Sequence, residues 1–302
     1  MINKRAQAIV EGSLLSGIAV ILWWLSYYIF PFIFLCSLPF IFLSYKWDWK
    51  ISSLSLIVTL MVVSLFINPL NTFFLYLPSG VLGIVLGWGI KKDLSLGKLF
   101  FLSSSANLFL ELLTIAGSII LFKLPLERVL GIDILKEGLK NSFNIEYLEG
   151  IQKQILSSIN LIIPSLLILS SFSQVILNYW IAYKIFKRFK WNLKALPSID
   201  TLRIPRKLWN ILFITLILSL VLSYFTSLGI NIFNNVIFLL QFLLVLEGFF
   251  VIWSYLQKNI SSNFLKILII LFFLFNPFLT FFVFILGVID IFYPIREKFL
   301  MR

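Results

Sequence analysis

Two carboxylates stand inside long apolar runs of this 302-residue chain. Glu111 lies in the middle of the run 99–122, and Glu247 lies in the second half of the run 232–256. A charged side chain at the centre of a bilayer costs about 2.5–3.5 kcal/mol on insertion scales, so such residues commonly contact an ion, a proton or a ligand. Both carboxylates are therefore candidate ligand-binding residues.

Neutral polar residues share helix faces with these carboxylates. Asn107 precedes Glu111 by one helical turn, and residues one turn apart lie on the same face of a helix. The predicted ligand-binding set is Asn107, Glu111, Gln174, Asn178, Gln241 and Glu247. Their three helices would line one polar cavity. The alternative is that the amides form interhelical hydrogen bonds, which contribute only about 0.6–2 kcal/mol each in membranes.

The residue inventory excludes several classes of catalytic site. The chain has no histidine and one cysteine, Cys36, which excludes Cys/His zinc sites and histidine-dependent catalysis. Asp290 is the only aspartate inside an apolar run, so the aspartate pair of intramembrane proteases is missing. We therefore expect no enzyme, no metal site and no cofactor, and an intramembrane enzyme of another type is the remaining alternative. Glu11 and Asp290 lie nearer the ends of their runs, which favours structural roles.

The composition places these residues in a membrane. Sixty per cent of the residues are apolar, 13% are charged and the mean hydropathy is +1.02, whereas a soluble domain is about half apolar and a quarter charged. The apolar runs are continuous and about 20 residues long, which is the length of a spanning helix. The strands of a membrane barrel would alternate apolar and polar residues instead. The sequence predicts an all-α, polytopic transmembrane helical bundle.

Run lengths and flanking charges predict about eight or nine spans. The expected helices cover residues 8–30, 31–45, 51–67, 72–90, 99–122, 160–186, 208–228, 232–256 and 264–292. The second is short and interrupted by Pro39, so it is broken or re-entrant. Asn276-Pro277 makes the last either one kinked helix or a re-entrant hairpin.

Charge and polarity divide the chain into five regions. They are an N-terminal five-helix membrane bundle (1–122), an extracytoplasmic amphipathic segment (123–158), a sixth helix (159–186), a basic cytoplasmic connector (187–207) and C-terminal membrane helices (208–302). The net charge is +12. The basic loops fall on one side of a cell membrane when the N-terminus is cytoplasmic. The charge excess therefore reflects topology and attraction to anionic lipids, and nucleic acid is not an expected partner.

Small residues recur at four-residue spacing on two helices. Ala8, Gly12 and Ser16 form one stripe, and a second contains Gly80, Gly83 and Gly87. Such stripes let helix backbones approach closely. Internal packing explains most stripes of this kind, but the first lies at the edge of the chain, so we predict that it is a partner interface.

Four stretches of the chain carry a resemblance to a known family. They are Ala8–Leu15, Leu77–Gly80 with Gly83 and Gly87, Arg203–Trp209, and Leu286–Phe292 with Arg296. In order and spacing they resemble the YybS-like family of bacterial multi-pass membrane proteins. Residues 5–185 are also similar to the S components of energy-coupling-factor vitamin transporters, which are bundles of about six helices. That resemblance implies a transmembrane coupling protein, or an ATPase, as a partner of the first helix.

Two functional hypotheses follow from these patterns. The first is a membrane protein that binds or transports a small molecule through an S-component-like bundle, and the polar stripes favour it. The second is a non-transporting scaffold that holds partner proteins or anionic lipid, and the basic cytoplasmic face favours it. The first requires a polar cavity at Glu111, Gln174 or Asn178. The second predicts tight packing at the same positions, with Glu111 and Glu247 each satisfied by neighbouring helices.

Overall fold

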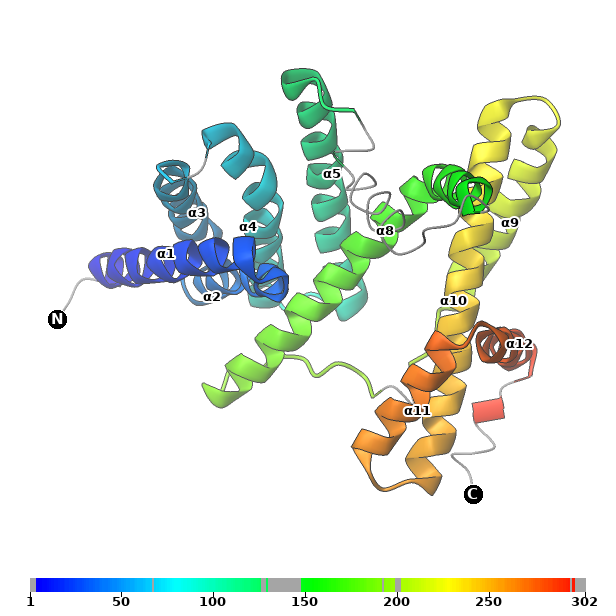
Figure 1. Ribbon diagram of the computed structural model, residues 1–302. Coiled ribbons are helices and arrows are strands. Elements are labelled where there is room, and N and C mark those ends of the chain that lie inside the picture. Colours follow the sequence, from blue (N-terminus) through cyan, green and yellow to red (C-terminus); the bar gives the residue numbers. More distant parts are fainter. Residues whose placement is uncertain are drawn as a thin grey trace. The chain divides into compact units, whose positions relative to one another are not determined.

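All elements that the structure describes are helical, as the composition predicts. A computed structural model describes residues 4–66, 68–125, 129, 148–191, 193–198, 202–293 and 295–296, and these contain ten α-helices and one 3₁₀ helix (Figure 1). The chain divides into two compact units. The first comprises residues 1–156 and 166–195, and the second comprises residues 157–165 and 196–302. The division after residue 195 lies within the basic connector 187–207.

The first unit follows the predicted order of helices. Its elements are α1 (Lys4–Tyr28), η1 (Phe30–Leu35), α2 (Leu38–Lys46), α3 (Trp49–Ser64), α4 (Pro69–Lys91), α5 (Leu96–Phe122) and most of α8 (Leu148–Arg188). The short second segment is broken, as predicted, because η1 ends at Leu35 and α2 begins at Leu38. Pro39 lies in the first turn of α2, where its missing N–H costs no intrahelical hydrogen bond.

Helix α8 begins earlier than the sequence predicts. It runs without interruption from Leu148 to Arg188, so the predicted start at residue 160 is wrong. The apolar positions 148, 151, 155 and 159 keep helical spacing up to the apolar run, and nothing in the sequence between them ends a helix. Most of the predicted surface segment 123–158, with the residues from 130 to 147, lies outside the described residues.

An aromatic cluster forms the core of the first unit. Trp23 of α1 and Phe40 of α2 are fully buried. The Trp23 ring stacks on Tyr76 of α4 with centroids 4.6 Å apart, and the Tyr76 hydroxyl donates to the Trp23 carbonyl at 3.1 Å. Aromatic pairs contribute about 0.5–1.5 kcal/mol beyond their buried area, so this cluster holds α1, α2 and α4 together.

The glycines of α4 form an internal packing surface. A Cβ atom on Gly83 would lie 2.9 Å from the Cβ of Phe40, and one on Gly87 would lie 2.7 Å from the Cβ of Ser44. A Cβ on Gly80 would overlap the side chain of Leu56 in α3. The stripe thus lets α4 approach α2 and α3 closely, as small residues do between membrane helices.

The small-residue stripe of α1 is covered within the chain. Ala8, Gly12 and Ser16 are all buried. The Ser16 and Ser55 hydroxyls share a hydrogen bond of 2.5 Å, and Ser55 of α3 also donates to the Gly12 carbonyl at 3.3 Å. A partner would therefore reach this predicted interface only by displacing α3.

The second unit contains four further helices and a sharp bend. They are α9 (Arg206–Ser223), α10 (Ser227–Asn259), α11 (Asn263–Phe275) and α12 (Pro277–Phe292). The last two meet at 104°, so the predicted break at Asn276-Pro277 is confirmed. Asn276 ends α11 and caps α12, because its Oδ1 accepts from the amides of Phe278 and Leu279 at 3.1 and 3.3 Å.

Asn235 of α10 replaces a backbone hydrogen bond of α8. Its Oδ1 accepts from the Ser165 amide at 2.9 Å, and its Nδ2 donates to the Leu161 carbonyl at 2.8 Å. In an undisturbed helix, these two backbone groups would bond to each other. Pro164 lies immediately before this opening, and a side chain inserted into the helical ladder is a recognised cause of a bend.

Helices α10 and α12 cross at a pair of glycines. A Cβ atom on Gly248 would overlap the Val283 carbonyl, and a Cβ on Gly287 would overlap the Leu244 carbonyl. Each glycine thus faces the backbone of the other helix. The two helices are in contact along their backbones at this crossing, which positions the residues on either side of it.

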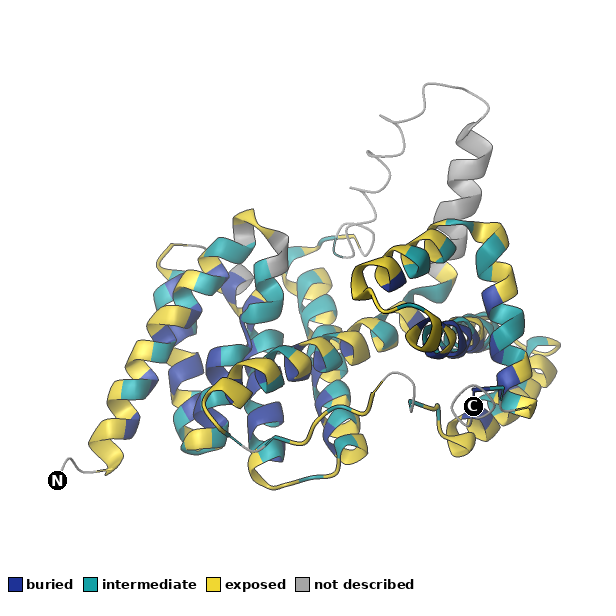
Figure 2. Cartoon of the chain, turned by 90° about the horizontal axis from the view of Figure 1, so that it is seen from below, coloured by how far each residue is buried: buried dark blue, intermediate teal, exposed yellow. Residues whose placement is uncertain are grey.

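The exposed surface of the chain is strongly apolar. Six helices among the described residues are long and apolar enough to cross a membrane, and the bent pair α11–α12 would make a seventh. Helices α2 and α3 are shorter. Figure 2 shows exposed residues along most helices, and these include many large apolar side chains such as Phe272 and Phe278. Apolar exposure on this scale indicates a membrane environment.

Candidate functional site

Helices α5 and α8 meet at a cluster of polar side chains. We define the Glu111 cluster as Asn107 and Glu111 of α5 with Ser170, Ser171 and Gln174 of α8. The Asn107 Nδ2 donates to Glu111 Oε1 at 2.8 Å and to Gln174 Oε1 at 3.0 Å. The Ser171 hydroxyl donates to Glu111 Oε2 at 2.8 Å, and the Ser170 hydroxyl lies 3.5 Å from the same oxygen. Both carboxylate oxygens are therefore engaged from α5 and α8.

Asn178 extends the cluster along α8 towards α2. Its Nδ2 donates to the Gln174 carbonyl at 2.9 Å, and its Oδ1 accepts from the hydroxyl of Ser37, the residue before α2. Four of the six predicted ligand-binding residues, Asn107, Glu111, Gln174 and Asn178, thus form one connected network. Helical spacing explains this, because the polar positions of each helix share one face.

Some buried polar atoms beside Glu111 lack a hydrogen bond. The Asn107 side chain is fully buried, and its Oδ1 has no partner among the described residues. The hydroxyls of Ser103 and Ser104, one turn earlier on α5, are likewise buried without a partner there. The large majority of buried side-chain polar atoms are paired in folded proteins, and a bound water or ion is one explanation of an unpaired atom.

The partners of Glu111 are neutral. The side chains that bond it in the described chain are an asparagine and two serines. The carboxylate lies within α5, one of the apolar helices long enough to span a membrane. A negative charge at this depth is costly without a compensating positive charge. The cluster thus surrounds one carboxylate with neutral hydrogen-bond donors and offers it no positive charge.

Glu247 lies in a different environment, which we call the Arg296 cluster. The Arg296 guanidinium contacts Glu247 Oε1 and lies 2.7 Å from Asp290 Oδ2, and its Nη1 donates to the Leu202 carbonyl at 2.5 Å. All three charged side chains are at least 95% buried. Glu247 therefore shares a cationic partner with Asp290, which Glu111 does not have.

The six predicted residues divide between the two units. The four of the Asn107–Asn178 network belong to the first unit, whereas Gln241 and Glu247 belong to the second. Gln241 is exposed on α10. Within the first unit the predicted residues form the network of α5 and α8, and within the second unit Glu247 belongs to an ion cluster that includes α10 and α12.

Sequence reasoning missed three polar residues of the second unit, the buried Arg296 and Lys266 and the half-buried Asn235. The sequence signal for Arg296 is its position shortly after Asp290, with which it forms an ion pair. Lys266 of α11 is buried and donates to Gln257 Oε1 at 2.7 Å and Asn263 Oδ1 at 3.2 Å. A lysine inside the apolar run 263–275 was a signal too. Asn235, the third residue, gave no signal that distinguishes it from other amides.

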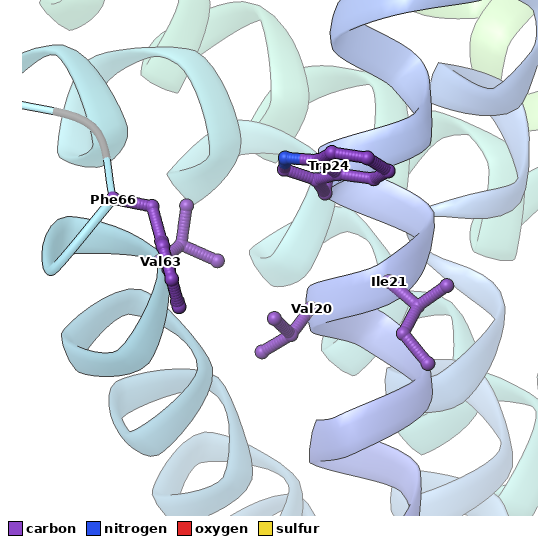
Figure 3. A pocket seen from close by; sticks show the side chains of 5 residues that line it. All are labelled: Val20, Ile21, Trp24, Val63 and Phe66. Atoms are coloured by element: carbon purple, nitrogen blue, oxygen red, sulfur yellow. The ribbon is translucent and has the colours of Figure 1, made fainter.

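A separate hollow between α1 and α3 is apolar. Its lining consists of Val20, Ile21, Trp24, Val63 and Phe66 (Figure 3). It offers hydrophobic side chains rather than an array of hydrogen-bonding groups. This hollow therefore does not supply the polar site that the sequence predicts, and the Glu111 cluster remains the candidate site.

Comparison with known proteins identifies a family over most of the chain. Residues 17–291 match the family described as "Predicted membrane protein (DUF2232)". No curated protein and no solved structure gives a significant match. The matched range includes the whole Glu111 cluster as well as Glu247 and Asp290. The chain therefore belongs to the DUF2232 family of predicted membrane proteins.

Proposed function

We propose that this membrane protein binds or transports a small polar molecule or ion at the Glu111 cluster. One observation carries the proposal. A carboxylate inside an apolar helix is surrounded by neutral donors, and fully buried Asn107 beside it keeps an unpaired oxygen. A cluster that served only to join α5 to α8 would be expected to pair its buried polar atoms. The unpaired atoms favour an occupant.

The proposal includes the resemblances to the YybS-like family and to the S components of vitamin transporters. In it, the first unit acts as an S-component-like bundle in a YybS-like protein, without catalysis, and a coupling protein or an ATPase supplies energy. The exposed apolar face of α1, which includes Ile9, Leu14 and Ile18, is the surface left for such a partner because the small-residue stripe is covered by α3.

The proposal also fixes a topology in the cell membrane. The six long helices and the shorter α2 and α3 make eight membrane elements, and the bent pair, counted as one span, makes nine. The N-terminus lies in the cytoplasm with the basic connector. Arg296 contacts Leu202 of that connector, and the hydrocarbon core is about 30 Å thick, so residue 296 lies on the connector's side. Labelling of single cysteines from outside the cell checks this arrangement.

A scaffold function is the second candidate, and one observation favours it. The carboxylates of Glu111 and Glu247 each receive a hydrogen bond from elsewhere in the chain, Glu111 from Ser171 of α8 and Glu247 from Arg296. The scaffold hypothesis predicts this arrangement. In it, the protein holds partner proteins or anionic lipid through its basic cytoplasmic loops, and the Glu111 cluster only joins α5 to α8.

Native mass spectrometry of the purified protein separates the two functions. The wild type released from its micelle is expected to carry a small ligand that Glu111→Ala loses. Glu11→Ala is the matched control, because Glu11 is a carboxylate of the same unit that pairs with Lys46 at 2.7 Å. It is expected to keep the ligand. An empty wild type, or phospholipid unaffected by either substitution, would refute ligand binding and support the scaffold.

A further inference from the structure

The charge balance of the Glu111 cluster restricts what it can bind. Among residues 4–125, the other acidic side chains are engaged elsewhere: Glu11 with Lys46, Asp93 with Lys194, and Asp48 with the Trp49 amide. No lysine or arginine in the described chain forms an ion pair with Glu111. The cluster thus carries one negative charge when Glu111 is ionised, and one positive charge would neutralise it.

The atoms around Glu111 are the ligands that a hard cation takes. The carboxylate supplies two oxygens, Ser171 and Ser170 supply hydroxyls, and Gln174 supplies an amide oxygen. Asn107 donates to Glu111 and Gln174 through its Nδ2, which leaves its buried Oδ1 as a further, unpaired oxygen of the cluster. Carboxylate, carbonyl and hydroxyl oxygens suit hard cations, whereas softer metals prefer thiolate or imidazole. The chain has no histidine, and Cys36 is buried in the aromatic core.

The single carboxylate also sets the charge of the ion. A divalent cation at this position would leave a net positive charge buried in an apolar helix, which is as costly as the negative charge it replaces. From these observations, the geometry points to a monovalent cation as the ligand of the Glu111 cluster. The inference rests on the proposed function and deepens it by giving the charge class of the ligand.

Thermal unfolding in detergent tests the inference with Na⁺ as the probe. The midpoint is compared in NaCl, in KCl and in the chloride of the bulky cation N-methyl-D-glucamine, all at equal ionic strength. Saturating Na⁺ or K⁺ is expected to raise the wild-type midpoint by about 5 °C relative to the bulky cation, because a ligand of the folded state stabilises it. Glu111→Gln, which keeps the side-chain size, is expected to abolish the shift, and Glu11→Gln is expected to keep it.

Two outcomes would overturn the inference. One is a wild-type midpoint that is the same in all three salts for a protein that carries no organic ammonium ligand, as expected if Glu111 simply carries a proton. The other is an equal Na⁺ shift in Glu111→Gln. If that variant does not fold, Ser171→Ala removes one oxygen ligand and is expected to require about tenfold more Na⁺ for half the shift, and an unchanged requirement would count against the site.

Different results would contradict the cation assignment and the proposed ligand binding. A neutral or anionic small molecule found on the wild type and lost in Glu111→Ala would overturn the cation assignment but support binding at the cluster. A protein that carries no ligand in the mass spectrometer and shows no alkali-ion shift would contradict both. An organic ammonium ligand found on the wild type, without any alkali-ion shift, would support a monovalent cation as the ligand. It would also show that this cation is an organic ammonium ion and not an alkali ion.

Discussion

Arg296→Leu is expected to destabilise the protein by about 3–5 kcal/mol, the range measured when one partner of a buried ion pair is removed. The substitution leaves Glu247 and Asp290 buried without their cation. It also removes the hydrogen bond from Arg296 Nη1 to the Leu202 carbonyl. The free energy of unfolding in mixed micelles, followed by tryptophan fluorescence, measures the loss.

Two further variants test whether the unpaired carboxylates of Glu247 and Asp290 cause the loss of stability in Arg296→Leu. Arg206→Leu is the control, since Arg206 is an exposed arginine of the same unit, and it is expected to change stability by less than about 0.5 kcal/mol. Adding Glu247→Gln and Asp290→Asn to Arg296→Leu is expected to restore part of the lost stability, because no unpaired charge remains buried. Near-wild-type stability of Arg296→Leu alone would show that the Arg296 cluster does not form.

Gly287→Ala is expected to cost about 2–3 kcal/mol, at the upper end of the range for overpacking a well-packed core. The added methyl group would overlap the Leu244 carbonyl of α10. A backbone atom cannot rotate away, so α12 must move off α10. The cost appears although alanine is the better helix former by about 1 kcal/mol, and Gly248→Ala should behave in the same way against the Val283 carbonyl.

Gly17→Ala supplies the matched control for this prediction. A Cβ on Gly17 of α1 has no neighbouring atom within 4 Å. The substitution is therefore expected to be neutral or slightly stabilising through helix propensity alone. Equal effects of Gly17→Ala and Gly287→Ala on the unfolding midpoint would show that the α10–α12 crossing is looser than the structure has it.

The sequence predicts helices well where apolar runs are bounded by clear signals. The break at Asn276-Pro277 and the interruption near Pro39 follow from local chemistry alone, because proline restricts the backbone wherever it stands. The network of Asn107, Glu111 and Gln174 was also accessible, since polar residues at helical spacing must share a face. What that argument could not decide is which helices face one another.

The Arg296 cluster shows why the remaining contacts were not predictable. Arg296 and Glu247 lie 49 positions apart, and they meet only because α12 bends away from α11 and crosses α10 at Gly248 and Gly287. The sequence contains both glycines, but their significance depends on the packing of one helix against another. For the same reason, the stripe of Ala8, Gly12 and Ser16 did not show by itself that it packs on α3.

The α5–α8 contact is the basis of the proposed site, and site-directed cross-linking tests it most directly. In a Cys36→Ser background, Asn107→Cys and Gln174→Cys place two thiols where the side-chain amides are 3.0 Å apart. A short bis-thiosulfonate reagent, applied to the protein in native membranes, is expected to link them, as peptide mass spectrometry would show. Phe109→Cys with Gln174→Cys is the control, because Phe109 is 61% exposed on the far side of α5. Efficient linkage of the first pair alone is the predicted result, whereas no linkage, or equal linkage of both pairs, would contradict the Glu111 cluster.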